Sequence, residues 1–104
     1  MQIQINTDKN VAFNEELRDS LSALLSKELS RYKDHITRLE VHLTDQDGGK
    51  HGLTDKRCMI EARPGGLQPI AVTEDAATYE KAVAGAVHKL ITTLERIIGR
   101  LRNL

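Results

Sequence analysis

The chain has 104 residues, of which 39% are hydrophobic and 29% are charged. This balance is typical of one small folded domain spanning residues 1–104, and it excludes both a disordered chain and two separately packed cores. The 15 basic and 15 acidic residues give a formal net charge of zero, so any affinity for nucleic acid must come from how the charges are arranged.

The first half of the chain predicts a strand, a helix and a second strand. Apolar and polar residues alternate over residues 1–6, which indicates a strand with one buried face. Asn14 is a candidate N-cap, and leucines at helical spacing predict a helix from about Glu15 to Lys33. Alternation over residues 38–43 predicts the second strand. The Gly- and Asp-rich stretch from Asp45 to Asp55 has no period and predicts a long mobile connection between neighbouring strands. Residues 45–52 are expected to make no core contacts.

The second half begins with two further strands. Alternation over residues 58–63 predicts the third strand, and residues 64–66, Pro-Gly-Gly, predict a turn. The fourth strand is expected from Leu67 to Thr73. It contains Pro69, which suits an edge position or a strand end because proline cannot donate a hydrogen bond to a neighbouring strand.

A long helix is expected at the end of the chain. Thr73 or Asp75 is its predicted cap, with Thr78 as a second candidate. Gly85 weakens the helix locally and is expected to allow close packing on the first helix. The predicted buried stripe consists of apolar residues at helical spacing: Val83, Val87, Leu90, Leu94, Ile97, Ile98 and Leu101.

The order of elements is therefore βαβββα, an α+β fold. The first two strands flank a helix and should be parallel through a right-handed crossover, and the last three should form an antiparallel meander. Both helices then cover one face of a four-stranded sheet. The opposite face is expected to be polar and to meet water. It carries Gln2, Gln4, Arg38, Glu40, His42, Met59 and Glu61.

Nothing in the sequence indicates an enzyme, a cofactor or a small-molecule substrate. The four histidines show no pair at the spacing of a zinc site, so we expect unpaired surface histidines and no metal. Asp45, Asp47 and Asp55 lie in a stretch without an apolar pocket that would raise a carboxyl pKa for general acid catalysis. The triplet at residues 48–50, Gly-Gly-Lys, is too short for a phosphate-binding loop.

The single cysteine, Cys58, excludes an internal disulfide framework and indicates a reducing compartment. It lies on the buried side of its strand and is expected to be a small core residue. No apolar run approaches the roughly 20 residues that span a bilayer. Residues 1–8 resemble no signal peptide. We therefore expect a cytoplasmic protein without membrane contact.

Basic residues gather on the predicted helices. Lys89, Arg96 and Arg100 fall within about 40° of one another on the last helix. On the first helix, Lys27 and Arg31 lie one turn apart. Together they would form a basic surface that can contact phosphates. Taken alone, the pattern is explained slightly better by a solvated amphipathic helix whose basic residues favour its C-terminal end.

Short motifs along the whole chain are similar to those of the bacterial ribosome hibernation-promoting and ribosome-associated inhibitor family, also called the sigma-54 modulation protein family. They are Met1–Ile5, Glu16–Arg18, Asp34–Thr37 with Leu39–Leu43, Pro64–Gly66 and Ala82–Leu90.

The resemblance implies a fold like that of double-stranded-RNA-binding domains. It also implies docking on the small ribosomal subunit, where messenger and transfer RNA would sit, which silences translation in slow growth. Arg18, Lys89 and Arg96 fall at basic positions of the family, and Lys27 and Arg31 correspond approximately. Two departures are Thr92 and His35, which stand where the family has arginine. Another is Lys56-Arg57, an additional basic pair.

The leading hypothesis is a non-enzymatic, ribosome-associated regulator of translation in stress, with ribosomal RNA of the small subunit as its partner. The alternative is a protein–protein adaptor that keeps the fold, has lost RNA binding and dimerises weakly through its sheet edge. The predicted RNA-binding residues are Arg18, Lys27, Arg31, Lys56, Arg57, Lys89, Arg96 and Arg100.

Overall fold

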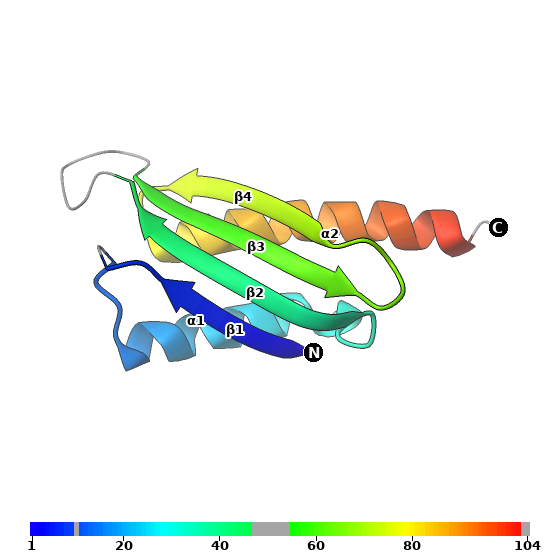
Figure 1. The fold of residues 1–104 in the computed structure, drawn as a ribbon, viewed down its shortest axis with the longest axis horizontal. Helices are drawn as coiled ribbons and strands as arrows, with labels where there is room; N and C mark the ends of the chain where they lie inside the picture. Colours follow the sequence, from blue (N-terminus) through cyan, green and yellow to red (C-terminus); the bar gives the residue numbers. More distant parts are fainter. Residues whose placement is uncertain (10, 47–54, 103–104) are drawn as a thin grey trace.

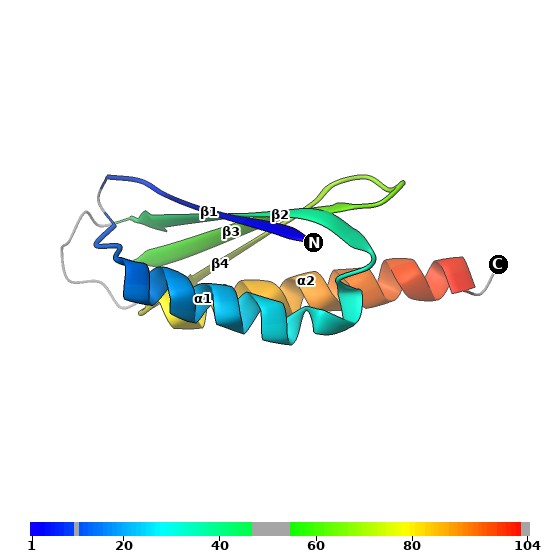
Figure 2. The same cartoon turned by 90° about the horizontal axis from the view of Figure 1, so that it is seen from below.

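The computed structural model describes residues 1–9, 11–46 and 55–102, and these form two layers. One layer is a sheet with the strand order β1-β2-β3-β4. The other holds the helices, which lie on the same face of the sheet (Figure 2). The strands are β1 (Gln2–Thr7), β2 (Ile36–Asp45), β3 (Lys56–Pro64) and β4 (Ile70–Ala76), and the helices are α1 (Glu15–Glu28), the short 3-10 helix η1 (Ser30–Tyr32) and α2 (Tyr79–Arg102).

The sheet topology confirms the predicted βαβββα order and α+β class. β1 pairs with β2 in parallel, and β2, β3 and β4 form an antiparallel meander. One row of apolar residues crosses all four strands, since Ile5 pairs with Val41, Val41 with Ile60 and Ile60 with Val72. The helices cover this row. The largest fully buried side chains are Leu21, Leu25, Leu29, Ile36, Leu39, Val41, Leu43, Ile60, Val83, Val87, Leu90 and Leu94.

The start of α1 follows the predicted capping pattern. The side chain of Asn14 accepts a hydrogen bond of 2.8 Å from the Leu17 amide, which satisfies one of the free N–H groups of the first turn. The end differs from the prediction, because α1 stops at Glu28 and the last turn tightens into η1. This turn still buries Tyr32, which explains why its apolar spacing predicts a longer α-helix.

The fourth strand lies three residues later than predicted. Gly66 has a φ of 73°, which glycine adopts without strain, and β4 starts only at Ile70, after Pro69. As a result β4 runs through Ala76, so the predicted caps at positions 73 and 75 are wrong. The hydroxyl of Thr78 instead accepts a hydrogen bond of 3.1 Å from the Lys81 amide, which confirms the second candidate.

Gly85 was predicted to allow close packing on the first helix, and in the structure its nearest neighbour is the Glu74 side chain of β4. A Cβ atom at this position would lie only 2.5–3.0 Å from side-chain atoms of Glu74. The Glu74 side chain points toward the helices from β4 and occupies the space that any larger residue at position 85 would need. The glycine thus allows α2 to lie close to the sheet edge.

The predicted connection from Asp45 to Asp55 is described only at its two ends. Asp45 is the last residue of β2, and the Gln46 amide donates a hydrogen bond of 2.7 Å to the Asp55 carbonyl. Both aspartates are buried, so the expectation that residues 45–52 make no core contacts is wrong for Asp45. Residues 47–54 lie outside the described residues, and the predicted mobility concerns mainly these positions.

The outer face of the sheet is polar, as predicted. The Nε2 atom of His42 lies 4.0 Å from Glu40 and 3.9 Å from Glu61, but it forms no hydrogen bond with any described residue. His42 is half-buried, whereas the predicted surface position holds for His35 and His88, which are exposed. His51 lies outside the described residues.

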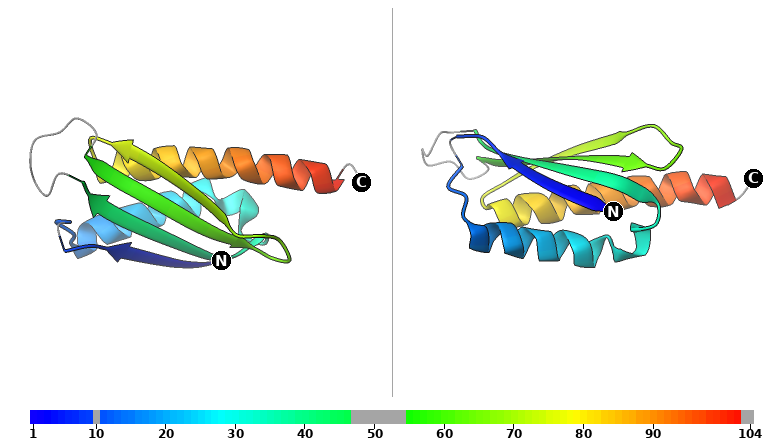
Figure 3. Two further views of the ribbon diagram at one scale, coloured as in Figure 1. Left: turned by 45° about the horizontal axis from the view of Figure 1, so that its top comes forward. Right: turned by 60° about the horizontal axis from the view of Figure 1, so that its bottom comes forward.

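The molecule is elongated, measuring 50 × 24 × 19 Å. α2 packs on β3 and β4, and its last turns continue beyond the sheet (Figures 1 and 3). α1 lies beside it, on the β1 side of the same face. Across the described residues, no helix is both long enough and apolar enough to cross a membrane.

Candidate nucleic-acid interface

The basic stripe on α2 lies at the surface. Lys89, Arg96 and Arg100 are all exposed, and at about 100° per residue they point in nearly the same direction. Among the described residues, neither Arg96 nor Arg100 has a carboxylate or any other hydrogen-bonding partner. A guanidinium group without a partner keeps its N–H donors available for phosphate oxygens.

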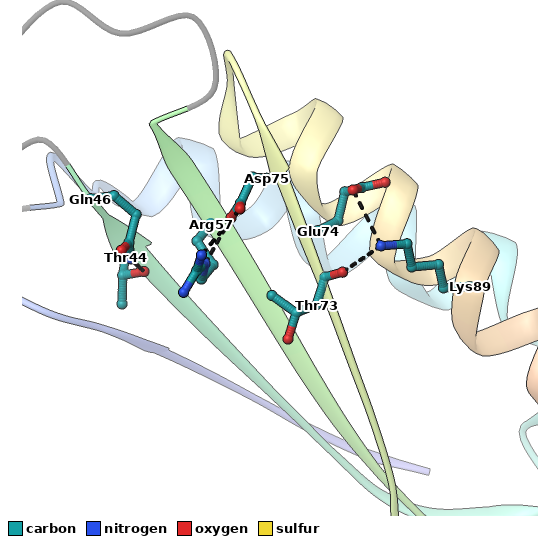
Figure 4. A network of polar contacts seen from close by, with 7 residues as sticks. All are labelled: Thr44, Gln46, Arg57, Thr73, Glu74, Asp75 and Lys89. Atoms are coloured by element: carbon teal, nitrogen blue, oxygen red, sulfur yellow. Dashed lines mark hydrogen bonds and ion pairs between the residues drawn. The ribbon is translucent and has the colours of Figure 1, made fainter.

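Lys89 differs from the two arginines, because it holds α2 against the edge strand. Its ammonium group donates a hydrogen bond of 2.7 Å to the Thr73 carbonyl and lies 3.4 Å from the Glu74 carboxylate (Figure 4). The side chain is nevertheless half exposed. Its charge is partly neutralised, so Arg96 and Arg100 carry most of the free positive charge of the stripe.

The cations of the first helical segment form a second group. Lys27 is in the last turn of α1, where the helix dipole favours a positive charge. Arg31 of η1 lies 3.8 Å from Glu95 of α2, and Glu95 also accepts a hydrogen bond of 2.9 Å from the Tyr32 hydroxyl. Glu95 thus lies on the side of α2 that faces η1. The charge of Arg31 is therefore partly neutralised by Glu95.

Arg18 is exposed in α1. Its guanidinium carbon lies 5.0 Å from the centroid of the Phe13 ring, a cation–π distance. The ring holds the side chain in place without neutralising its charge, so Arg18 remains able to bind an anion.

Lys56 is part of a largely buried ion cluster. Its ammonium group lies 3.0 Å from Asp45 and 2.9 Å from Asp55, whose side chains are only 6% and 5% exposed. The hydrogen bonds that the ammonium donates to these two carboxylates, that to Asp55 first, raise the pKa of Lys56 far above its usual value. The ammonium also lies 5.7 Å from the Tyr79 ring centroid. Lys56 therefore joins β2, β3 and the start of α2, and its charge is not free for phosphate.

Arg57 lies on the opposite side of the sheet from the helices. Its Nε and one terminal nitrogen bind the two carboxylate oxygens of Asp75 at 2.8 and 3.2 Å (Figure 4). This bidentate pairing lowers the pKa of Asp75. The sequence analysis missed the partner because it assigned Asp75 to a helix cap. The structure therefore brings neither Lys56 nor Arg57 to the helical surface.

Cys58 is fully buried in the core, as predicted. Burial raises the pKa of its thiol to about 12, so the thiol stays protonated at neutral pH. A protonated, solvent-excluded thiol is a poor nucleophile.

The two-layer fold and the exposed stripe on α2 define an α+β domain whose helical layer is suited to binding phosphates. The family model of the sigma 54 modulation protein / S30EA ribosomal protein matches residues 3–102. The chain belongs to this family of ribosome-associated factors, which is not known as a family of enzymes. This confirms the resemblance found in the sequence.

Two solved structures are similar to this chain. The crystal structure of the Protein Y N-terminal domain from Thermus thermophilus is 25% identical, with a TM-score of 0.71 over 93% of this chain and 99% of that chain. A ribosomal subunit interface protein from Coxiella burnetii is 22% identical, with a TM-score of 0.72 over 95% of this chain and 99% of that chain. The second likeness supports the fold alone. No curated protein matches the sequence significantly.

Proposed function

We propose that this protein is a non-catalytic regulator of translation that binds the small ribosomal subunit and acts in the cytoplasm. The observation that carries the proposal is the family match over residues 3–102. It is supported by the likeness to the Thermus thermophilus Protein Y domain, which extends over almost the whole of both chains.

The proposed contact surface is the outer side of the helical layer. Arg96 and Arg100 would bind phosphates of ribosomal RNA most directly, since they have no partners among the described residues. Lys89, Lys27 and Arg31 would extend this surface on either side, with Arg18 at the far end of α1. Lys56 and Arg57 are left out, because carboxylates already neutralise them.

Such binding would regulate translation by occupancy. A protein on the small subunit at the place of messenger and transfer RNA excludes both, and no chemical step is needed. The proposed role is hibernation or inhibition of translation under stress, when few ribosomes are needed.

Co-sedimentation with purified small, large and intact ribosomal particles at two salt concentrations tests this function. We expect binding to the small subunit that weakens steeply with salt. The logarithm of the association constant should fall with that of the salt concentration by about 0.7–0.9 per phosphate contact, because each contact releases counterions. No binding, or binding to the large subunit alone, would contradict the proposal.

Salt-independent binding would favour the adaptor function instead. That alternative has one structural observation in its favour, an apolar cavity of about 360 Å³ beneath the projecting part of α2. Leu67, 39% exposed, and Leu94 and Ile97 of α2 contribute to its lining. A weak homodimer would be seen as a concentration-dependent mass in analytical ultracentrifugation.

A further inference from the structure

Three potential ligand atoms converge on the outer face of the sheet. Glu40 of β2 pairs directly with Glu61 of β3, and His42 lies two residues beyond Glu40 on the same face. The Nε2 atom of His42 is 4.0 Å from Glu40 Oε2 and 3.9 Å from Glu61 Oε1. One ligand atom from each residue lies within 4.8 Å of the others.

The nitrogen at the centre of this cluster has no hydrogen-bonding partner. Nε2 of His42 is buried from solvent and forms no hydrogen bond with any described residue. A buried polar atom without a partner costs free energy. The direct pairing of two glutamates across neighbouring strands is also unfavourable, because like charges repel. A cation between the three groups would remove both costs.

Glu40 is already oriented for such a role. Its other oxygen, Oε1, lies 2.7 Å from a terminal nitrogen of Arg38, which also donates a hydrogen bond of 2.8 Å to the Gln4 side chain. This leaves Oε2 directed at His42. Partners of this kind, which hold a ligand in position from outside, are typical of metal sites.

We propose that Glu40, His42 and Glu61 form a binding site for a divalent transition-metal ion, with Zn²⁺ as the best match to one imidazole and two carboxylates. Zinc binds such nitrogen and oxygen ligands at about 2.0–2.2 Å, which places neighbouring ligand atoms roughly 3.4 Å apart in a tetrahedral site. The two distances from Nε2 of His42 are wider than this by about half an ångström, and all three ligand atoms lie within 4.8 Å of one another. Rotation of the two glutamate side chains would have to bring the carboxylate oxygens closer to the imidazole and to each other.

This site does not depend on the proposed ribosome binding. It lies on the outer face of the sheet, whereas the α2 stripe belongs to the helical layer on the other face (Figure 2). Local sequence patterns do not indicate this site, because its ligands come from two strands that only the sheet brings together.

Calorimetric titration of the tag-free protein with ZnCl₂, above the ordinary pKa of histidine, tests the site. We expect one saturable binding event in the parent, weakened by about tenfold or more in His42→Gln and Glu61→Gln. The matched control, His88→Gln, removes an exposed histidine from α2 and should leave affinity unchanged. MgCl₂ should bind at least tenfold more weakly, since it prefers oxygen ligands alone.

NMR spectra of the histidine rings provide a second measurement that requires no substitution. Zinc should shift the His42 ring signals more than those of the other histidines. Largest shifts at another histidine, unchanged affinity in folded His42→Gln, or no saturation up to about 1 mM Zn²⁺ would overturn the proposal.

Discussion

The α2 helix and the outer face of the sheet differ in how their cations are neutralised. α2 carries five basic residues against two acidic ones, and Arg96 and Arg100 contact no acid among the described residues. The outer face of the sheet carries three arginines and three acidic residues, and two of these arginines, Arg38 and Arg57, bind carboxylates at 2.7 and 2.8 Å.

This difference explains how a chain with no net charge can have a basic surface. The sheet holds many of its acids next to its cations, so their fields largely cancel. The excess positive charge is left on the exposed side of α2. The local pairing of charges, and not the overall composition, therefore decides where an anionic partner can bind.

The largest effect is expected from two triple variants, one that removes three positive charges from α2 and one that removes three from the outer face of the sheet. Replacing Lys89, Arg96 and Arg100 by glutamine should weaken ribosome association by roughly 10- to 1,000-fold and reduce the slope of the salt dependence by about three. Stability should fall only modestly, because Arg96 and Arg100 are exposed and the contacts of Lys89 with Thr73 and Glu74 are half exposed. Quantitative co-sedimentation and thermal unfolding measure the two effects.

The matched control changes the net charge by the same amount on the other face. Arg38, Arg57 and Arg63 all lie on β2 and β3 at positions that point away from the helices, and their replacement by glutamine should leave ribosome association nearly unchanged. Equal losses in the two triple variants would show that only total charge matters, and the distinction between the two faces would fail.

The second test concerns the most fully neutralised cation. Lys56→Met keeps the aliphatic stem but leaves the buried carboxylates of Asp45 and Asp55 without their cation, so we expect the Tm to fall by roughly 10 °C or more. Ribosome association of the folded variant should not change. Differential scanning calorimetry measures the shift.

A second variant separates charge from packing in this cluster. Replacing both aspartates by asparagine in addition to Lys56→Met should recover much of the lost stability, because no buried charge remains. If the Tm of Lys56→Met lies within a degree or two of that of the parent, the ion cluster does not stabilise the contact between β2, β3 and α2 as its geometry indicates.

Most of the fold could be predicted from local patterns. Alternation and helical spacing are properties of neighbouring residues, and they predicted every described strand and both long helices. The boundary of β4 was missed because Pro69 and the preceding turn delay pairing until Ile70. The reason for Gly85 was missed as well, since it depends on Glu74 of another element.

For the candidate site, the sequence predicts where the basic residues lie on α2 but not which of them are paired with acidic residues. The spacing of residues 89, 96 and 100 along one helix is enough to place them on one side of it. Whether a cation is free depends on acids that are distant in the sequence, as with Arg57 and Asp75, or with Arg31 and Glu95. Helical spacing carries no information on such pairs, so Lys56 and Arg57 looked as available for RNA as Arg96.

The smallest expected effect is that of breaking the ion pair between Arg57 and Asp75. Arg57→Gln should lower the Tm by only about one degree at neutral pH, since both side chains are substantially exposed. The effect at neutral pH is small, and the pH dependence of the Tm identifies the pair.

The two hydrogen bonds that Arg57 donates lower the pKa of Asp75 in the folded protein. The pair therefore contributes stability above the ordinary pKa of aspartate, and this stability is lost as the pH falls through the lowered pKa. The difference in Tm between parent and variant should therefore be constant near neutrality and disappear in acid. Asp75→Asn should show the same profile, and the double variant should lose no more than either single one. A difference that persists after Asp75 is protonated would mean that Arg57 stabilises the sheet by packing, and the outer face would then be less dependent on charge pairing than its geometry indicates.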